Sequence, residues 1–283
     1  MRRIHGSGDE VKPAATIAPM TSTRLWDRAA DLPMPAHRRP RPELTSLPAE
    51  NPPTIAELFT FMRDAELRFD ALRMRIEERS FGVEGEQLTV VEVALRHPGE
   101  ARITTNQPAR GTAATYEVWI SDGETVRTYS APHALGTERP VRRRLVGVSG
   151  PDSRDLPATS RVYAPLTALP AETLPEAFVH PAGYCQNVLA TGRCRIVGMD
   201  DVGGREAIVL ECDHPRTIEM VADRPDFSIR VSVDRTDGVI LRLVESIGGV
   251  VTRDARVIEY APDALLAPST FDFAFPTGTT MLY

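Results

Sequence analysis

The sequence predicts an α+β fold that is mainly β: a large curved antiparallel sheet, or half-barrel, wrapped around a few helices. Short apolar runs that alternate with polar residues recur along most of the 283-residue chain. Helical spacing of apolar residues is confined to two regions, near 54–68 and 172–189. We expect about ten or eleven of these runs to pair in one sheet, which is too many for a flat sheet, because strand twist makes a wide sheet curl or close.

The first region, residues 1–53, is predicted to be a disordered tail. It holds nine of the 24 prolines and shows almost no periodic apolar pattern. One short stretch, residues 24–32, has the composition of an amphipathic helical turn that could dock on the domain or on a partner. We therefore divide the chain into a Pro-rich tail over 1–53 and one half-barrel domain over 54–283.

A capping box marks the start of the first helix. The Thr54 hydroxyl can accept a hydrogen bond from the third helical amide while Glu57 reaches back to the amide of the cap. Apolar residues then recur at helical spacing, which gives the helix one apolar face. The pattern predicts a helix over about 54–68.

Two runs of strands follow, separated by a long loop over 150–175 and by one or two short helices within 172–189, interrupted at Pro181. Turn residues such as Gly82–Gly85, Ser121–Glu124 and Gly203–Gly204 separate the strands. The first run is expected at 72–81, 88–93, 102–105, 116–120, 125–129 and 142–148. The second is expected at 193–199, 205–212, 217–222, 228–234, 239–246 and 252–260, with a last strand or strand-like edge at 271–276.

Composition excludes several classes of function. The formal charge of −6 arises from 39 acidic and 33 basic residues mixed along the chain, so no nucleic-acid footprint is expected. No run approaches the roughly 18 apolar residues that a transmembrane helix requires. The written N-terminus lacks the apolar segment of an export signal. This indicates a cytoplasmic protein as written, or a cell-envelope protein if the sequence is a mature form or begins at a wrong start.

We find no catalytic, metal or cofactor motif. A Gly-x-Ser-x-Gly nucleophile elbow, a helical His-x-x-x-His pair and a phosphate-binding glycine loop are all absent from the sequence. The chain is therefore predicted to be non-enzymatic, without a cofactor or a metal. Three cysteines are too few for a disulfide scaffold; they are expected to be buried thiols, or Cys185 and Cys194 could form a disulfide if the protein is exported.

Several segments, in order over 54–283, resemble the LolA-like superfamily of lipoprotein carriers, which includes RseB and mycobacterial lipid-binding lipoproteins. They are the helix and strand over 54–81, the run from Leu95 to Pro108, the Ile120–Gly123 hairpin with Tyr129, and the closing stretch from Phe271 to Gly278. The chain departs from the carrier at His97, where the carrier has an arginine before the proline.

The resemblance implies a hydrophobic cavity between curved sheet and helices that accepts acyl chains, with a lipid or an acylated protein as the ligand. His97 and Arg102 are expected at the cavity mouth. The alternative is an RseB-like regulatory protein that docks on an anti-sigma-type partner. Apolar residues at the expected lining positions would equally serve a packed core. These positions are Leu58, Phe59, Met62, Leu72, Met74, Ile76, Trp119, Ile229, Val231, Leu241 and Leu243.

Overall fold

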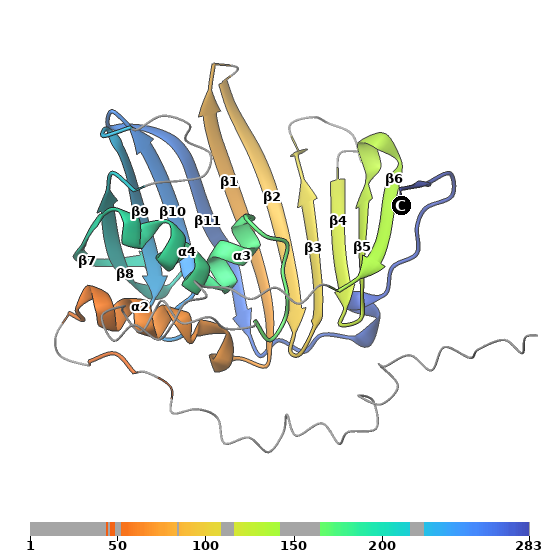
Figure 1. Cartoon of the computed structure of the whole chain (residues 1–283), viewed down its shortest axis with the longest axis horizontal. Coiled ribbons are helices and arrows are strands. Elements are labelled where there is room, and N and C mark those ends of the chain that lie inside the picture. The colour runs from red at the N-terminus through yellow and green to blue at the C-terminus, as the bar shows by residue number, and fades with distance from the viewer. Residues whose placement is uncertain are drawn as a thin grey trace, which may run out of the picture. The chain divides into compact units, whose positions relative to one another are not determined.

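The strands of the described residues form one open, curved wall (Figure 1). The computed structural model describes residues 44, 46–48, 52–83, 85–108, 116–141, 165–215 and 224–282. All of them fall within one compact unit, Glu43–Tyr283. The predicted helical turn at 24–32 and the predicted strands at 142–148 and 217–222 lie outside the described residues.

Twelve strands make up this sheet. The first meander comprises β1 (Ala71–Gly82), β2 (Gly85–Arg96), β3 (Glu100–Asn106), β4 (Tyr116–Asp122), β5 (Thr125–Ser130) and β6 (Leu135–Pro140). The second comprises β7 (Arg193–Val202), β8 (Arg205–Asp213), β9 (Phe227–Asp234), β10 (Ile240–Ile247) and β11 (Val250–Pro262), and β12 (Thr280–Leu282) closes the chain. The spatial order is β12-β6-β5-β4-β3-β2-β1-β11-β10-β9-β8-β7.

The pairing of β1 with β11 joins the two meanders. β1 pairs antiparallel with β2 on one side and with β11 on the other, from Leu72 opposite Pro262 to Ser80 opposite Arg253. The predicted single curved sheet is therefore confirmed. Two details differ from the prediction: β6 was not expected, and β12 pairs with β6 in parallel, so the sheet is mixed.

The closing aromatic segment is not a strand, contrary to the prediction for 271–276. A 3₁₀ turn, η7 (Pro268–Phe271), is followed by residues without ladder pairing as far as β12. Phe273 and Phe275 pack instead against Val118, Ile120 and Tyr129 of the sheet. Alternating aromatic residues thus serve here as a strap across the sheet, and Pro276 has no amide proton to donate to a ladder.

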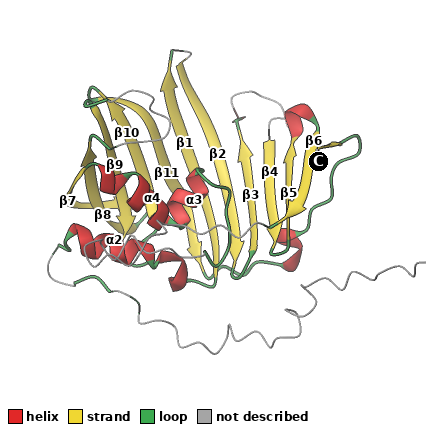
Figure 2. Cartoon of the chain, viewed as in Figure 1, coloured by secondary structure: helices red, strands yellow, loops and turns green. Residues whose placement is uncertain are grey.

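Three short α-helices lie against one face of the sheet (Figures 1 and 2). α2 (Ile55–Arg63) begins with the predicted capping box: Thr54 Oγ1 accepts from the Glu57 amide at 3.2 Å, and Glu57 Oε2 accepts from the Thr54 amide at 2.7 Å. The helix is shorter than predicted, because the chain turns at Asp64 into a 3₁₀ helix, η2 (Ala65–Arg68). The predicted interruption at Pro181 separates α3 (Leu174–Val179) from α4 (Pro181–Asn187).

The main core lies between these helices and the sheet. In Figure 1, α2, α3 and α4 lie in front of the side of the wall formed by β1 and β7–β11. Fully buried side chains from α2, such as Leu58 and Met62, meet Leu72 and Met74 of β1 and the inward residues of β8–β10 in one cluster. The strap packs on the opposite face, where Gly136 leaves room for it: a Cβ there would lie 2.7 Å from the Phe275 ring.

Gly238 lies where the β9–β10 turn approaches α2 most closely. It has a φ of +79°, and a Cβ would lie 3.0 Å from the Phe61 carbonyl oxygen and 3.1 Å from its ring. Gly204, at a φ of +80°, has no neighbour within 4 Å. These two residues therefore share a backbone conformation and differ in their surroundings.

We predict that Gly238→Ala destabilises the fold more than Gly204→Ala does. Each substitution carries about 1–2 kcal/mol of left-handed backbone strain. Crowding against α2 adds about 1–3 kcal/mol at Gly238. Urea unfolding of both variants measures the difference, and equal losses would contradict the contact between turn and helix.

Candidate functional site

The predicted lining residues come together in one apolar cluster between α2 and the sheet. All except Trp119 are less than 9% exposed, and Trp119 is half-buried at the border of that cluster. Met62 and Met74, whose flexible thioethers fit irregular shapes, lie within it. Among the described residues these side chains pack as a core, and their role as cavity lining remains a prediction.

The helix-facing side of the sheet changes from apolar to polar at Trp119. Its direct cross-strand neighbours are Ile103 of β3, which belongs to the core, and Thr128 of β5. Thr128 in turn pairs with Thr137 of β6 through a 2.6 Å hydroxyl contact. In Figure 1 none of α2, α3 and α4 lies in front of β5 and β6. The face therefore passes from an apolar, helix-covered part to a polar, less covered part at Trp119.

A buried polar cluster lies where η2, the end of β2 and the break between α3 and α4 meet. Glu66 Oε2 accepts a hydrogen bond from the Leu166 amide at 3.0 Å and lies 3.2 Å from His180 Nδ1. His180 Nε2 lies 2.9 Å from the Thr167 carbonyl oxygen, and His97 Nδ1 lies 2.9 Å from the Thr167 hydroxyl. The cluster thus attaches residues 166 and 167 to the helices and to the sheet.

Burial makes this cluster electrically neutral near pH 7. It raises the pKa of Glu66 to about 8, against the opposing hydrogen bond from the Leu166 amide. It lowers the pKa of His97 to about 4 and that of His180 to about 3. A protonated carboxyl and two neutral imidazoles avoid placing a charge in the apolar interior. Sequence reasoning missed Glu66 and Thr167, because a glutamate in a helical region normally predicts a solvent-facing side chain.

The two residues predicted at a cavity mouth lie apart. His97 stacks on Phe69 with ring centroids 5.5 Å apart and belongs to the buried cluster. Arg102 lies on the other face of β3, because its strand neighbours Ala101 and Ile103 point into the core. Its guanidinium donates to the Thr270 carbonyl of the strap at 3.3 Å. A shared role for these residues at one opening therefore stays a prediction that this geometry does not favour.

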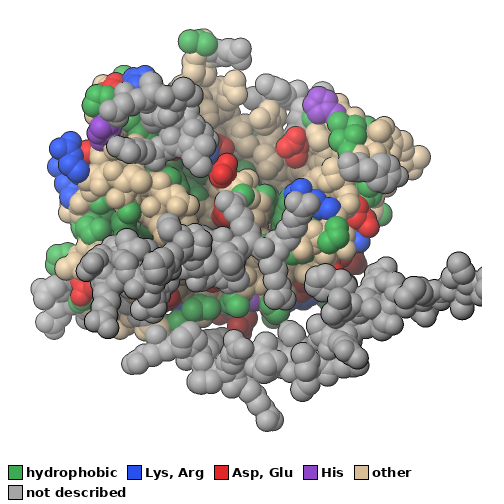
Figure 3. Space-filling view, viewed as in Figure 1, with side chains coloured by type: hydrophobic (Ala, Val, Ile, Leu, Met, Phe, Trp, Pro, Cys, Tyr) green, Lys and Arg blue, Asp and Glu red, His purple; other side chains and the backbone are tan. Residues whose placement is uncertain are grey.

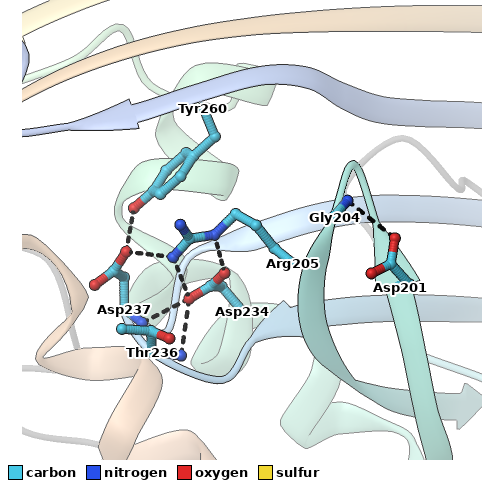
Figure 4. Close-up of polar contacts among 7 residues, drawn as sticks. All are labelled: Asp201, Gly204, Arg205, Asp234, Thr236, Asp237 and Tyr260. Atoms are coloured by element: carbon cyan, nitrogen blue, oxygen red, sulfur yellow. Dashed lines mark hydrogen bonds and ion pairs between the residues drawn. The ribbon is translucent and has the colours of Figure 1, made fainter.

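A second polar network connects β8, the β9–β10 turn and β11 (Figure 4). Arg205 donates to Asp234 at 2.5 and 3.1 Å and to Asp237 at 2.9 Å. The Tyr260 hydroxyl donates to Asp237 at 3.0 Å, and its ring lies 4.5 Å from the Arg205 guanidinium carbon. Asp234 also accepts from the amides of Thr236 and Asp237. These contacts fix the turn that Gly238 packs against α2, which makes the network structural.

A hollow of about 370 Å³ lies on the face of the sheet opposite the helices. It is lined by residues of β7–β10, among them Met199, Arg230, Ser232 and Arg242. Both arginines are paired with carboxylates, Arg230 with Glu211 and Arg242 with Asp254 at 2.7 Å. The charges at this hollow are therefore compensated within the protein, which argues against a dedicated anion site.

The three cysteines are free thiols. Cys185, on α4, is buried with its sulfur 3.6 Å from the Met62 sulfur. Cys194 of β7 lies directly opposite Cys212 of β8. The disulfide between Cys185 and Cys194 stays a prediction, and the strand register gives Cys194 a nearer candidate that sequence reasoning did not consider.

Three other kinds of site are a metal site, a membrane-spanning helix and a basic surface band, and the described residues give evidence on each. Within the described ranges, no group of three or more His, Cys, Asp or Glu side chains could hold a metal ion. No helix described by the structure is long and apolar enough to cross a membrane. On the face shown in Figure 3, the Lys and Arg side chains of described residues form no continuous basic band.

The buried cluster predicts how stability changes with pH. Glu66 ionises near 4.5 in an unfolded chain and near 8 in the fold, so unfolding releases its proton between these values and stability falls as pH rises. His97 and His180 act in the opposite sense, because unfolded imidazoles take up protons below about 6.5 while the buried ones stay neutral. Between pH 6.5 and 8, the loss within this cluster therefore comes from Glu66.

We predict that Glu66→Gln removes this loss and leaves the decline below pH 6.5 in place. The expected change in slope between pH 6.5 and 8 is at most about 1.4 kcal/mol per pH unit. Urea unfolding at a series of pH values measures it. Glu206→Gln is the control, since the Glu206 side chain is 63% exposed and water already solvates it. A Glu66→Gln profile parallel to that of the wild type would refute a protonated Glu66.

Of the comparisons with known proteins, only the one with solved structures gives matches. No family model matches the chain, and no curated protein matches it. Among solved structures, the chain is similar to MucB, with 15% identity and a TM-score of 0.44, over 77% of this chain and 62% of MucB. The chain therefore spans about three fifths of the length of MucB.

Two further structures are similar over nearly their whole length. An uncharacterised conserved protein from Thermus thermophilus has 10% identity and a TM-score of 0.44, with 81% of this chain and 99% of that chain covered. A LolA superfamily protein from Nitrosomonas europaea has 10% identity and a TM-score of 0.30, with 75% and 94% covered. All three similarities lie at 15% identity or less and at TM-scores below 0.5.

Proposed function

We propose that this protein binds a hydrophobic acyl-chain ligand, a lipid or an acylated protein, on the helix-facing side of its curved sheet. The observation that carries the proposal is the position of Trp119 at the border of the core. This large side chain lies half-buried at the point where the apolar core meets a part of the sheet that α2, α3 and α4 do not cover. An acyl chain could extend the core there and cover apolar surface that is otherwise in contact with water.

The composition of the interior supports the same ligand class. Apolar side chains from α2, β1, β2, β9 and β10 form one continuous cluster that reaches Trp119. Met62 and Met74 can repack around a flexible chain at low cost. Two buried titratable groups of the interior, Glu66 and His180, are neutral near pH 7. A neutral wall suits an alkyl chain.

The arrangement of the polar groups supports binding rather than catalysis. Glu66, His97 and His180 are engaged with Thr167, Leu166 or one another within the interior. The Arg205 network is engaged in holding a turn. A nucleophile with a base and an orienting group has not been found among the described residues, and we propose binding rather than catalysis.

We predict that oleate binding changes the fluorescence of Trp119. The chain has two tryptophans, so a Trp26→Phe variant reports on Trp119 alone. Titration with oleate should move its emission to shorter wavelength and saturate at micromolar concentration, because an alkyl chain displaces water from the exposed side of the ring. The matched control is Trp119→Phe, in which Trp26 alone should report no shift.

Native mass spectrometry of the wild-type chain provides an independent measurement. The expected result is an oleate adduct, which a fluorescent fatty acid displaces. Neither an adduct nor a change in Trp119 emission at micromolar oleate would refute an acyl-chain site.

The second candidate is an RseB-like regulatory protein that binds an anti-sigma-type partner. One of the solved structures similar to this chain is the complex of MucB with MucA from Pseudomonas aeruginosa. In the described sheet β7 is a terminal strand, and its Val197 and Met199 are 42% and 47% exposed. Deleting residues 1–50 should abolish capture of such a partner and leave oleate binding intact, whereas unchanged capture would reject a role for the tail.

A further inference from the structure

Cys194 and Cys212 face one another across the β7–β8 hairpin. Residues directly opposite in an antiparallel pair have Cα atoms about 4.5–5.5 Å apart, which is within the range that a disulfide spans. Both sulfurs also lie close to one atom, the Leu189 carbonyl oxygen, at 3.1 Å for Cys194 and 3.3 Å for Cys212. The two thiols thus point to the same side of the hairpin and converge.

The chain on that side holds the pair tightly. Gly192 packs so closely that a Cβ there would lie 2.6 Å from the Cys212 sulfur and 2.8 Å from the Asp213 carbonyl oxygen. Cys212 is fully buried, while Cys194 is half-buried on the terminal strand of the described sheet. One thiol is therefore accessible to a reagent and the other lies behind it.

The more accessible thiol, Cys194, is also the more reactive of the two. The close contact with Cys212 lowers the pKa of Cys194, while that contact and burial raise the pKa of Cys212. A thiolate is the attacking species in disulfide exchange. Cys194 is thus the attacking sulfur, and Cys212 is the sulfur that resolves the intermediate.

We propose that Cys194 and Cys212 form a reversible disulfide in exchange with a small-molecule disulfide such as oxidised glutathione. The Cys194 thiolate attacks one sulfur of the reagent, forms a mixed disulfide and releases one glutathione thiolate. The Cys212 thiol gives up its proton and attacks the Cys194 sulfur, which releases the second glutathione. Two protein thiols are oxidised, one reagent disulfide is reduced, and the two protons end on the two glutathione molecules.

The disulfide would act on two elements. It would tie the terminal strand β7 to β8, and it would remove both S–H donors from the Leu189 carbonyl. Leu189 begins the 3₁₀ turn η6 (Leu189–Thr191) that leads from α4 into β7, and its side chain belongs to the main core. Oxidation thus acts on the end of the helical layer that covers the sheet.

Tryptic mapping of the full-length protein tests the assignment. The reduced protein is incubated with oxidised glutathione in the folded state, and its remaining thiols are alkylated after denaturation. Cleavage after Arg193, Arg195, Arg205 and Arg216 would leave residues 194–195 joined to residues 206–216. The alkylated thiol count should fall from three to one, with Cys185 still alkylated. Amide hydrogen exchange in β7 should slow on oxidation.

Two variants give matched controls. Cys185→Ser should yield the same cross-linked peptide and no alkylated thiol. Cys212→Ser should yield no cross-link and a stable glutathione adduct on Cys194, because the resolving thiol is absent. A cross-link between Cys185 and Cys194, or glutathione adducts without any bridge in the wild-type protein, would overturn the assignment. Neither outcome depends on whether the protein binds an acyl chain.

Discussion

The pairing of β1 with β11 is the constraint on which the rest of the structure depends. It brings residues nearly two hundred positions apart into one ladder and turns two local meanders into a single wall. Without it, each meander would have one more exposed edge, and the apolar residues of β1 and β10 would not line one surface. The ladder bends at a register shift between Arg75 and Ile76, where local twist increases. The main core and the proposed site at Trp119 both depend on this shared wall.

Polar contacts set the position of the helical layer at its two ends. At one end, Glu66, His180 and His97 gather around Thr167 and connect η2, the α3–α4 break and the end of β2. At the other, Arg205, Asp237 and Tyr260 hold the turn that meets Phe61 of α2 through Gly238. Apolar packing alone is not directional, so these contacts specify where on the sheet the helices lie. They differ in charge: burial keeps the first neutral, and the second holds an ion pair between the partly buried Arg205 and the buried Asp234.

Local patterns in the sequence predicted local structure well. The Thr54–Glu57 capping box, the break at Pro181 and the turns at Gly82, Gly123 and Gly203 all lie where alternation and turn chemistry placed them. Features that depend on tertiary contacts were not predictable in this way. The aromatic residues at 271–275 alternate like a strand but pack as a strap, and Glu66 is buried because distant residues surround it. Neither outcome can be inferred from the pattern of neighbouring residues in the sequence.

One inserted residue in β7 explains several features together. A regular hairpin closed at Val202 and Arg205 would place Arg195 opposite Cys212. The register shift between Ile196 and Gly198 moves Cys194 into that position instead, and it leaves Val197 without a partner on β8. The same irregularity lies in the wall of the outer hollow, which Val197, Gly198 and Met199 line. A bulge on a terminal strand also discourages pairing with other chains. Since the cysteine pair and the hollow share this bulge, a disulfide that fixes the register of β7 would also fix the shape of the hollow.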